Sequence, residues 1–174
     1  MNLVLLALRV VIGVLFVGHG SQKLFGSFGG AGPEKTGAQF ESLGLRPGRV
    51  MAVGAGASEL AGGCLIAFGL LTPLAAALVI AVMLTAIWTV HLQRGPWITN
   101  GGYEYNLVII AAMFALAGIG AGDWSLDNVF GLEPTGAGWA LGALAAGLFG
   151  AWSAVVFGHA SFGHRAGPPQ PAGQ

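Results

Sequence analysis

Six ionisable residues lie in or at the edges of long apolar runs, and they are the candidates for chemistry in this chain: Arg9, His19, Lys23, Glu59, His91 and Glu104. A charge is costly in apolar surroundings, so an ionisable residue inside a membrane span indicates a functional site by default. The chemistry that these types offer is proton handling, because imidazole titrates near neutral pH and burial raises the pKa of a carboxyl group toward it.

Helical spacing predicts that most of these residues face one another. His19 and Lys23 are four residues apart and share a face. Glu59 follows Gly56 on a face that is otherwise small. If successive spans run up and down, one polar pocket forms from His19, Lys23, Glu59, His91 and Glu104, with Arg9 toward the opposite side. In this interpretation Glu59 and His91 are the catalytic, proton-handling pair, and the other residues bind or orient a ligand.

Each of these residues also has a purely structural explanation. Glu59 paired with Lys23 or Arg9 would only hold the bundle together, since buried charges must be paired. His91 and Glu104 near the interface would be solvated caps. Arg9 would extend to the nearby headgroups.

Composition places the chain among integral membrane proteins. Of its 174 residues, 55% are hydrophobic and 8% are charged, and the mean hydropathy is +0.74. The formal net charge is zero, which gives no indication of nucleic-acid binding. A single cysteine, Cys64, permits neither an internal disulfide nor a C-x-x-C pair, and no metal-binding motif is present.

Five segments are apolar and nearly long enough to span a bilayer, which needs about 20 residues. The sequence therefore predicts an all-α membrane protein with a four-helix transmembrane bundle (residues 1–127), a loop and a fifth C-terminal transmembrane helix (128–157), and a disordered tail (158–174). The predicted spans are residues 3–25, 50–71, 74–92, 103–119 and 138–157. Residues 26–49 are expected to form a polar, glycine-rich loop, and Ser125 or Asp127 to cap a short interfacial helix.

The positive-inside rule predicts the orientation. Lysine and arginine gather in the first loop (residues 26–49), the third loop (residues 93–102) and the tail, as in Arg46, Arg49 and Arg94. We therefore expect a multi-pass protein of the cell (inner or plasma) membrane, with its C-terminus in the cytoplasm and its N-terminus outside.

The fifth span has no Lys, Arg, Asp or Glu. Its small residues repeat every fourth position, at Gly142, Ala146, Gly150 and Ala154, which is typical of close helix packing. We expect this ridge to pack against the bundle or a partner, either a redox protein or a second copy of the chain.

Three stretches resemble the DoxX family of membrane proteins: LRVVIGVLFVGHGSQKLFG (Leu8 to Gly26), ASELAGGCLIAFGLLTPLAAALVIAVMLTAIWTVH (Ala57 to His91) and GGYEYNLVIIAAMFALAGIGAGDWSLD (Gly101 to Asp127). The resemblance covers roughly residues 3–127 and implies a four-helix membrane bundle whose polar positions fall on the residues above. It also implies redox physiology, because relatives include subunits of a thiosulfate:quinone oxidoreductase.

Three functions follow from the residues and the resemblance together. The first is a component of a quinone- or thiol/sulfur-linked membrane oxidoreductase system, whose polar cluster binds a small polar or quinone-like ligand and moves protons; the residues do not identify the cofactor, and quinone is one candidate. The second is a non-enzymatic scaffold or accessory subunit for a redox partner. The third is a small-solute or proton transporter. A haem held between His19 and His91 is a minor alternative, since two histidines alone are weak evidence.

Overall fold

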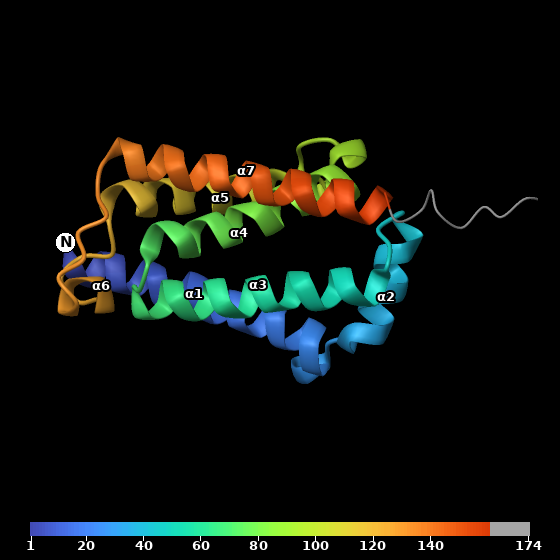
Figure 1. Ribbon diagram of the computed structural model, residues 1–174, viewed down its shortest axis with the longest axis horizontal. Coiled ribbons are helices and arrows are strands. Elements are labelled where there is room, and N and C mark those ends of the chain that lie inside the picture. Colours follow the sequence, from blue (N-terminus) through green and yellow to red (C-terminus); the bar gives the residue numbers. More distant parts are fainter. Residues whose placement is uncertain (161–174) are drawn as a thin grey trace, which may run out of the picture.

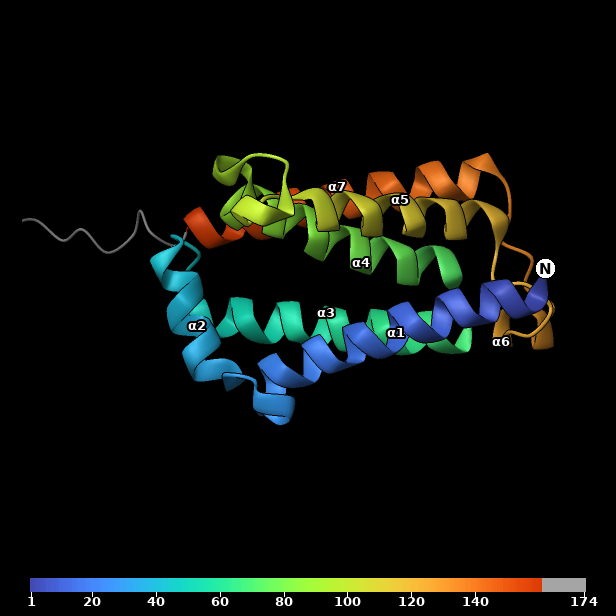
Figure 2. The ribbon, with the colours of Figure 1, turned by 180° about the vertical axis from the view of Figure 1, so that it is seen from behind.

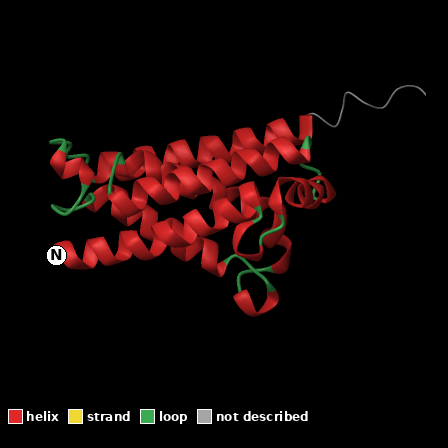
Figure 3. Ribbon diagram, turned by 90° about the horizontal axis from the view of Figure 1, so that it is seen from below, coloured by secondary structure: helices red, strands yellow, loops and turns green. Residues whose placement is uncertain are grey.

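The computed structural model describes residues 1–160, and within this range it contains helices and connecting turns but no strand. The long helices run roughly side by side, and the turns gather at the two ends of the molecule (Figure 3). The all-α membrane class predicted from the sequence is therefore confirmed. The predicted tail, residues 158–174, falls mainly outside the described residues.

The helices form two layers (Figure 1). The first layer pairs α1, Asn2–Phe25, with α3, Gly48–Phe68. The second contains α4, Thr72–Ala86; α5, Glu104–Ile119; and α7, Ala137–Ala160. At one end, α2, Gly32–Ser42, crosses the first layer (Figure 2). At the other end, the short helix α6, Leu126–Val129, lies near the N-terminus.

Four helical stretches are long and apolar enough to cross a membrane: residues 2–25, 48–68, 72–94 and 137–160. The third stretch includes α4, the π-helical turn η2 (Ile87–His91) and the 3-10 turn η3 (Leu92–Arg94). The fourth predicted span, residues 103–119, corresponds to α5, which has 16 residues and at 1.5 Å per residue is about 24 Å long. It is shorter than the usual span but lies alongside α4 and α7 (Figure 1).

Residues 26–49 were predicted to form a loop, and this prediction was only partly correct because the region contains the helix α2. Pro33 and Glu34 lie in the first turn of α2, where proline has a suitable φ and a carboxylate interacts favourably with the helix dipole. These signals were available in the sequence. Residues 98–100 form a further 3-10 turn, η4 (Ile98–Asn100), in the third loop.

Glycine allows α1 and α3 to approach closely. A Cβ atom at Gly13 would lie 2.6 Å from the carbonyl oxygen of Gly63, and one at Gly20 would lie 2.6 Å from the backbone nitrogen of Leu60. No real side chain fits at such distances, so the two backbones are in direct contact. This is the packing that small residues permit between membrane helices.

The two layers share a hydrophobic core near the α6 end. Ile12 and Phe16 of α1, Ile66 of α3 and Met113 of α5 are among its buried members. Within the second layer, α7 packs against α4 through Gly147, where a Cβ would lie 2.8 Å from Cβ of Ile80. Toward the α2 end the layers separate and enclose a cavity.

The ridge predicted on α7 faces the bundle only in its second half: a Cβ atom at Gly150 would lie 3.2 Å from Cβ of Ala81, and Gly150 and Ala154 line the cavity. Gly142 and Ala146 are exposed, whereas the buried residues are Ala140, Ala143, Gly147, Ala151 and Gly158. The predicted and observed rows are both small residues at similar spacing, so the sequence pattern does not distinguish them.

Candidate functional site

Lys23 and Glu59 form a partly buried ion pair between α1 and α3. The Lys23 Nζ atom lies 2.8 Å from Oε1 and 2.6 Å from Oε2 of Glu59. The Glu59 side chain is 5% exposed and that of Lys23 is 23% exposed. The pair exists because the helices touch at Gly56, where a Cβ would lie 3.0 Å from Cβ of Lys23. Of the two structural pairings considered for Glu59, the structure has the one with Lys23.

His91 lies at the end of the π-helical turn η2. Turns of this kind are rare and frequently occur at functional sites. Its Nδ1 atom lies 2.6 Å from the carbonyl oxygen of Gly101. A carbonyl only accepts, so Nδ1 carries the hydrogen, and in the neutral ring Nε2 is left with a lone pair. The loop thus fixes the tautomer in which Nε2 can accept a proton or a hydrogen bond.

A cavity of about 710 Å³ brings these groups together. His19, Lys23, Glu59 and His91 all line it, with Phe40 and Leu45 from the α2 region at its end. The rest of its wall is mainly apolar and comes from α3, α4, α5 and α7. Four of the five residues predicted to meet in one pocket therefore share a single cavity. His19 is itself exposed, and its ring packs edge-on against the ring of Phe16, with the two ring centroids 6.4 Å apart.

The fifth predicted residue, Glu104, has another position. Its Oε2 atom accepts a hydrogen bond of 3.0 Å from the backbone nitrogen of Ile98, and it is not among the cavity-lining residues. Its own backbone nitrogen donates to the carbonyl of Pro96 at 2.8 Å. Glu104 thus organises the loop that supplies the Gly101 carbonyl to His91.

Arg9 lies apart from the cavity, as expected, in a second polar cluster at the α6 end. It is 0% exposed, so the alternative in which it extends to headgroups is wrong. Its Nη2 atom donates to the carbonyl of Trp124. Asp127 is close enough to attract it electrostatically. The Asp127 carboxylate also accepts from the backbone nitrogens of Leu71, at 2.7 Å, and Thr72, at 3.1 Å.

Sequence reasoning missed that second role of Asp127, which caps the first turn of α4 from a distant loop. The hydroxyl of Thr72 donates to the same carboxylate at 2.6 Å. The expected cap of α6 is present, because Ser125 Oγ accepts from the backbone nitrogen of Asn128 at 3.2 Å. A local capping pattern in the sequence identifies Ser125 as a cap. It cannot identify the bond between Asp127 and Thr72, which are 55 residues apart.

Asn106 of α5 is a further polar residue of the cavity that the sequence analysis did not single out. It is 5% exposed, lines the cavity, and its amide nitrogen lies 3.4 Å from Sδ of Met83. A buried amide in an apolar span is a usable sequence signal. In the described residues, no three His, Cys, Asp or Glu side chains gather as a metal site would require.

The fold and the site together define a multi-pass α-helical membrane protein with an ion-paired, mostly apolar cavity between its helix layers. Residues 4–92 match the family model described as DoxX. The chain belongs to the DoxX family.

One curated relative is the protein named "Putative oxidoreductase CatD" from Bacillus subtilis (strain 168). It is 36% identical over 113 residues, which is 65% of this chain and 78% of the relative. No solved structure matches. Both comparisons support a DoxX membrane protein with a relative named as an oxidoreductase.

Proposed function

We propose that the protein binds a quinone-like ring beside Lys23 and Glu59, as the membrane component of a quinone- or thiol-linked oxidoreductase system. The observation that carries this proposal is the position of the ion pair, at the wall of an apolar cavity of about 710 Å³. Sites for small organic ligands commonly have this size, with apolar walls and a few placed polar groups. The name of the curated relative agrees with redox chemistry.

The residues at the site fit a ring with two carbonyl oxygens. The Lys23 ammonium has three donors, and two contacts with Glu59 leave capacity for a ligand oxygen. The Nε2 atom of His91 can accept a proton or, when the ring is protonated, donate one. Reduction of a 1,4-quinone to its quinol takes up two electrons and two protons. Glu59 and His91 are the groups that we assign to moving those protons.

The electrons must come from outside the chain, since Cys64 is its only thiol. A dithiol that becomes a disulfide releases two electrons and two protons, which balances quinone reduction. We therefore place the donor on a partner protein or a small dithiol.

The test uses duroquinone, whose fully substituted ring does not add thiols. We expect purified protein in nanodiscs to bind it in calorimetric titration, and Glu59→Gln to weaken binding at least tenfold while the protein stays folded. Glu34→Gln, at an exposed carboxylate outside the cavity, is the matched control. Absence of binding to the unmodified protein, or full binding by Glu59→Gln, would contradict the proposal.

The same preparation distinguishes the quinone proposal from the haem alternative. A haem between His19 and His91 would give a Soret band in the visible absorption spectrum, and we expect none. A band lost in His91→Ala would replace the quinone proposal by a haem protein.

The scaffold function has one supporting observation, the outward face of α7. Trp139, Phe149 and Trp152 are each more than half exposed, and Cβ atoms at Gly142 and Gly138 would meet nothing within 4 Å. This face contacts lipid or another protein. Crosslinking from a photoreactive residue at position 142 in cells would reveal a redox partner or a second copy, if either binds there.

For the orientation we propose that the α2 end faces the cytoplasm in the cell's inner or plasma membrane. The supporting observation is the location of Lys35, Arg46, Arg49 and Arg94 in the α2 region and the third loop, against Asp123, Asp127 and Glu133 in the loops of the other end. Since α1 starts at that other end, the N-terminus would lie outside.

A further inference from the structure

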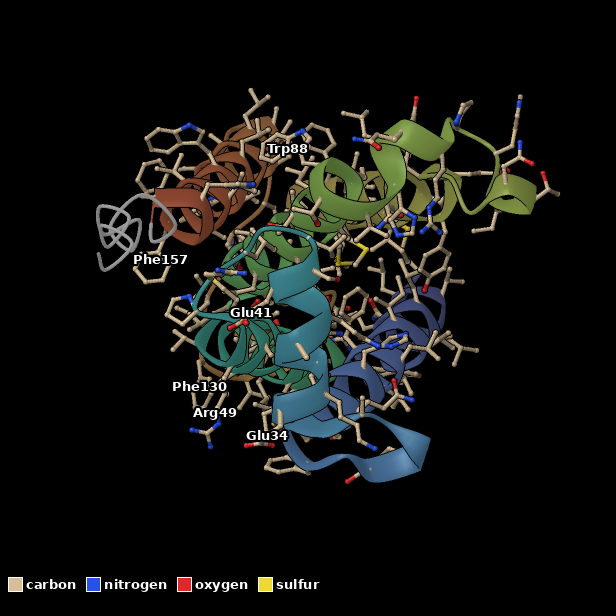
Figure 4. All side chains as sticks on the ribbon, turned by 90° about the vertical axis from the view of Figure 1, so that its right-hand side faces the viewer. Glu34, Glu41, Arg49, Trp88, Phe130 and Phe157 are labelled. Carbon is tan, nitrogen blue, oxygen red and sulfur yellow. The ribbon has the colours of Figure 1, made fainter. Side chains whose placement is uncertain are left out.

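The cavity has a polar side and an apolar side. His19 and Lys23 of α1 lie on one flank, and Ala154 and Phe157 of α7 lie on the other. Glu59 belongs to the polar flank because it contacts Lys23. The view from the α2 end shows α1 on the opposite side of the molecule from α7 and Phe157 (Figure 4).

The helix α3 spans both flanks, and its residues show where the apolar flank lies. Gly56 packs against α1. Gly54, two residues earlier, is rotated from it by about 160° around the helix axis. Gly54 lines the cavity and is exposed, and a Cβ there would meet nothing within 4 Å. The cavity is therefore open beside Gly54, on the side of α3 away from α1.

The rim of this opening is apolar and is formed by α3 and α7. Val50 is 56% exposed and Phe157 is 53% exposed, and both line the cavity. They belong to α3 and α7, which are both long and apolar enough to cross a membrane. An opening between two spans leads into the hydrocarbon layer rather than into water.

The end of the cavity nearest α2 is closed. Leu45 is 2% exposed, and a Cβ at Gly158 would lie 2.7 Å from its Cδ2 atom. The backbone nitrogen of Arg46 donates to the carbonyl of Gly158 at 2.9 Å, which ties the C-terminal end of α7 to the loop before α3. A ligand that reaches the ion pair therefore has an apolar route from the side.

We infer that the ligand is an amphiphile whose ring lies beside Lys23 and Glu59 and whose long apolar tail leaves the cavity between α3 and α7 into the bilayer. This inference rests on the proposed function and adds to it the class of ligand, a quinone with a lipid side chain. Moving an apolar tail from lipid into the passage adds little free energy, because the tail is already out of water. The passage consequently selects the ligand by shape and fixes the direction of entry.

Two matched probes test the tail: duroquinone, and the same ring with one methyl replaced by an n-decyl chain. The test variant is Gly54→Leu, which narrows the opening at a position where a Cβ atom would meet nothing within 4 Å. The control is Gly142→Leu, at an equally open glycine on α7 outside the cavity. We expect Gly54→Leu to weaken binding of the decyl compound at least tenfold and leave duroquinone binding unchanged. Gly142→Leu should change neither.

The outcomes separate the inference from the proposed function. If the unmodified protein binds neither probe, the proposed function and the inference both fail. If it binds duroquinone and Gly54→Leu does not affect the decyl compound, the tail does not pass Gly54 and only the inference fails. The direction of the tail has its own readout, a diazirine at the end of the decyl chain. Crosslinks to peptides of α3 and α7 support the inference, and crosslinks confined to residues 16–25 or 98–106 overturn it.

Discussion

The Lys23 ammonium lies within hydrogen-bonding distance of both carboxylate oxygens of Glu59, at 2.6 and 2.8 Å, although the two residues are 36 positions apart. This contact depends on a backbone-to-backbone approach of α1 and α3 that only glycine permits. It also places the strongest charges of the cavity where they neutralise each other. The site therefore has polar chemistry without an uncompensated charge, which a low-dielectric interior would not tolerate.

The first prediction concerns the cost of breaking this pair. Lys23→Met leaves Glu59 buried without its partner, and removal of one member of a buried pair destabilises by roughly 3–5 kcal/mol. We expect a lower free energy of unfolding in urea–detergent titrations for Lys23→Met and Glu59→Gln singly, and a smaller loss for the double variant than the sum of the two. Additive losses would show that the two side chains do not interact.

The second prediction concerns the glycine contact that sets the pair. In Gly20→Leu the new side chain would meet the backbone of Leu60 and Gly56 at under 3 Å. Overpacking costs typically 1–3 kcal/mol, and here it should also separate Lys23 from Glu59. We expect a lower thermal midpoint and loss of duroquinone binding. Gly18→Leu, on the same helix with nothing within 4 Å, should match the unmodified protein, and an equal loss there would point to a general effect of leucine in α1.

The third prediction assigns Glu104 to positioning rather than to ligand contact. Glu104→Ala removes the acceptor for the backbone nitrogen of Ile98, so the loop of residues 95–103 should exchange its amide hydrogens faster. Loss of such a bond costs about 1 kcal/mol. We expect Glu104→Gln, which keeps a carbonyl acceptor, to restore slow exchange and ligand binding. If Gln fails to rescue either, the negative charge itself is needed and Glu104 acts on the ligand.

The fourth prediction separates the Arg9 cluster from the site. Asp127→Ala removes the acceptor of three hydrogen bonds from Leu71 and Thr72. Unsatisfied buried donors cost about 1–3 kcal/mol each. We expect reduced thermal stability but an unchanged dissociation constant for duroquinone in the folded fraction. A changed dissociation constant at normal stability would place this end of the molecule in the binding mechanism.

The fifth prediction tests the orientation. In a Cys64→Ala background, single cysteines replace the exposed residues Gln39 and Glu133. If the α2 end is cytoplasmic, a membrane-impermeant maleimide applied to intact cells should label the cysteine at 133 and not the one at 39. The reverse pattern would mean that the N-terminus is inside.

Much of the fold followed from local sequence patterns. The apolar runs predicted the spans, and helical spacing placed Glu59 on the same small face of α3 as Gly56, which is the face that contacts α1. Turn chemistry predicted the Ser125 cap. Each of these depends on residues within one or two helical turns, so the sequence carries the whole signal.

Other features could not be obtained in this way. The five polar residues were predicted in one pocket from helix faces and span direction, and the structure brings four to the cavity, whereas Glu104 bonds within its own loop. The π-helical turn that ends at His91 has no simple sequence pattern. The helix α2, by contrast, was signalled by Pro33 and Glu34 in its first turn. The glycine residues and the polarity of residues 26–49 favoured a loop instead.

The sequence by itself determined that this chain enters the membrane, where its long apolar helices lie, and that its few charges must be paired. It could not choose between two rows of small residues on α7, because Gly142 and Gly147 satisfy the same local spacing. Tertiary structure decided that Gly147 meets Ile80 and that the row through Gly150 and Ala154 borders the cavity. The reason is physical: a helix repeats its residues every 3.6 positions whichever way it is turned, and only contact with its neighbours fixes the rotation.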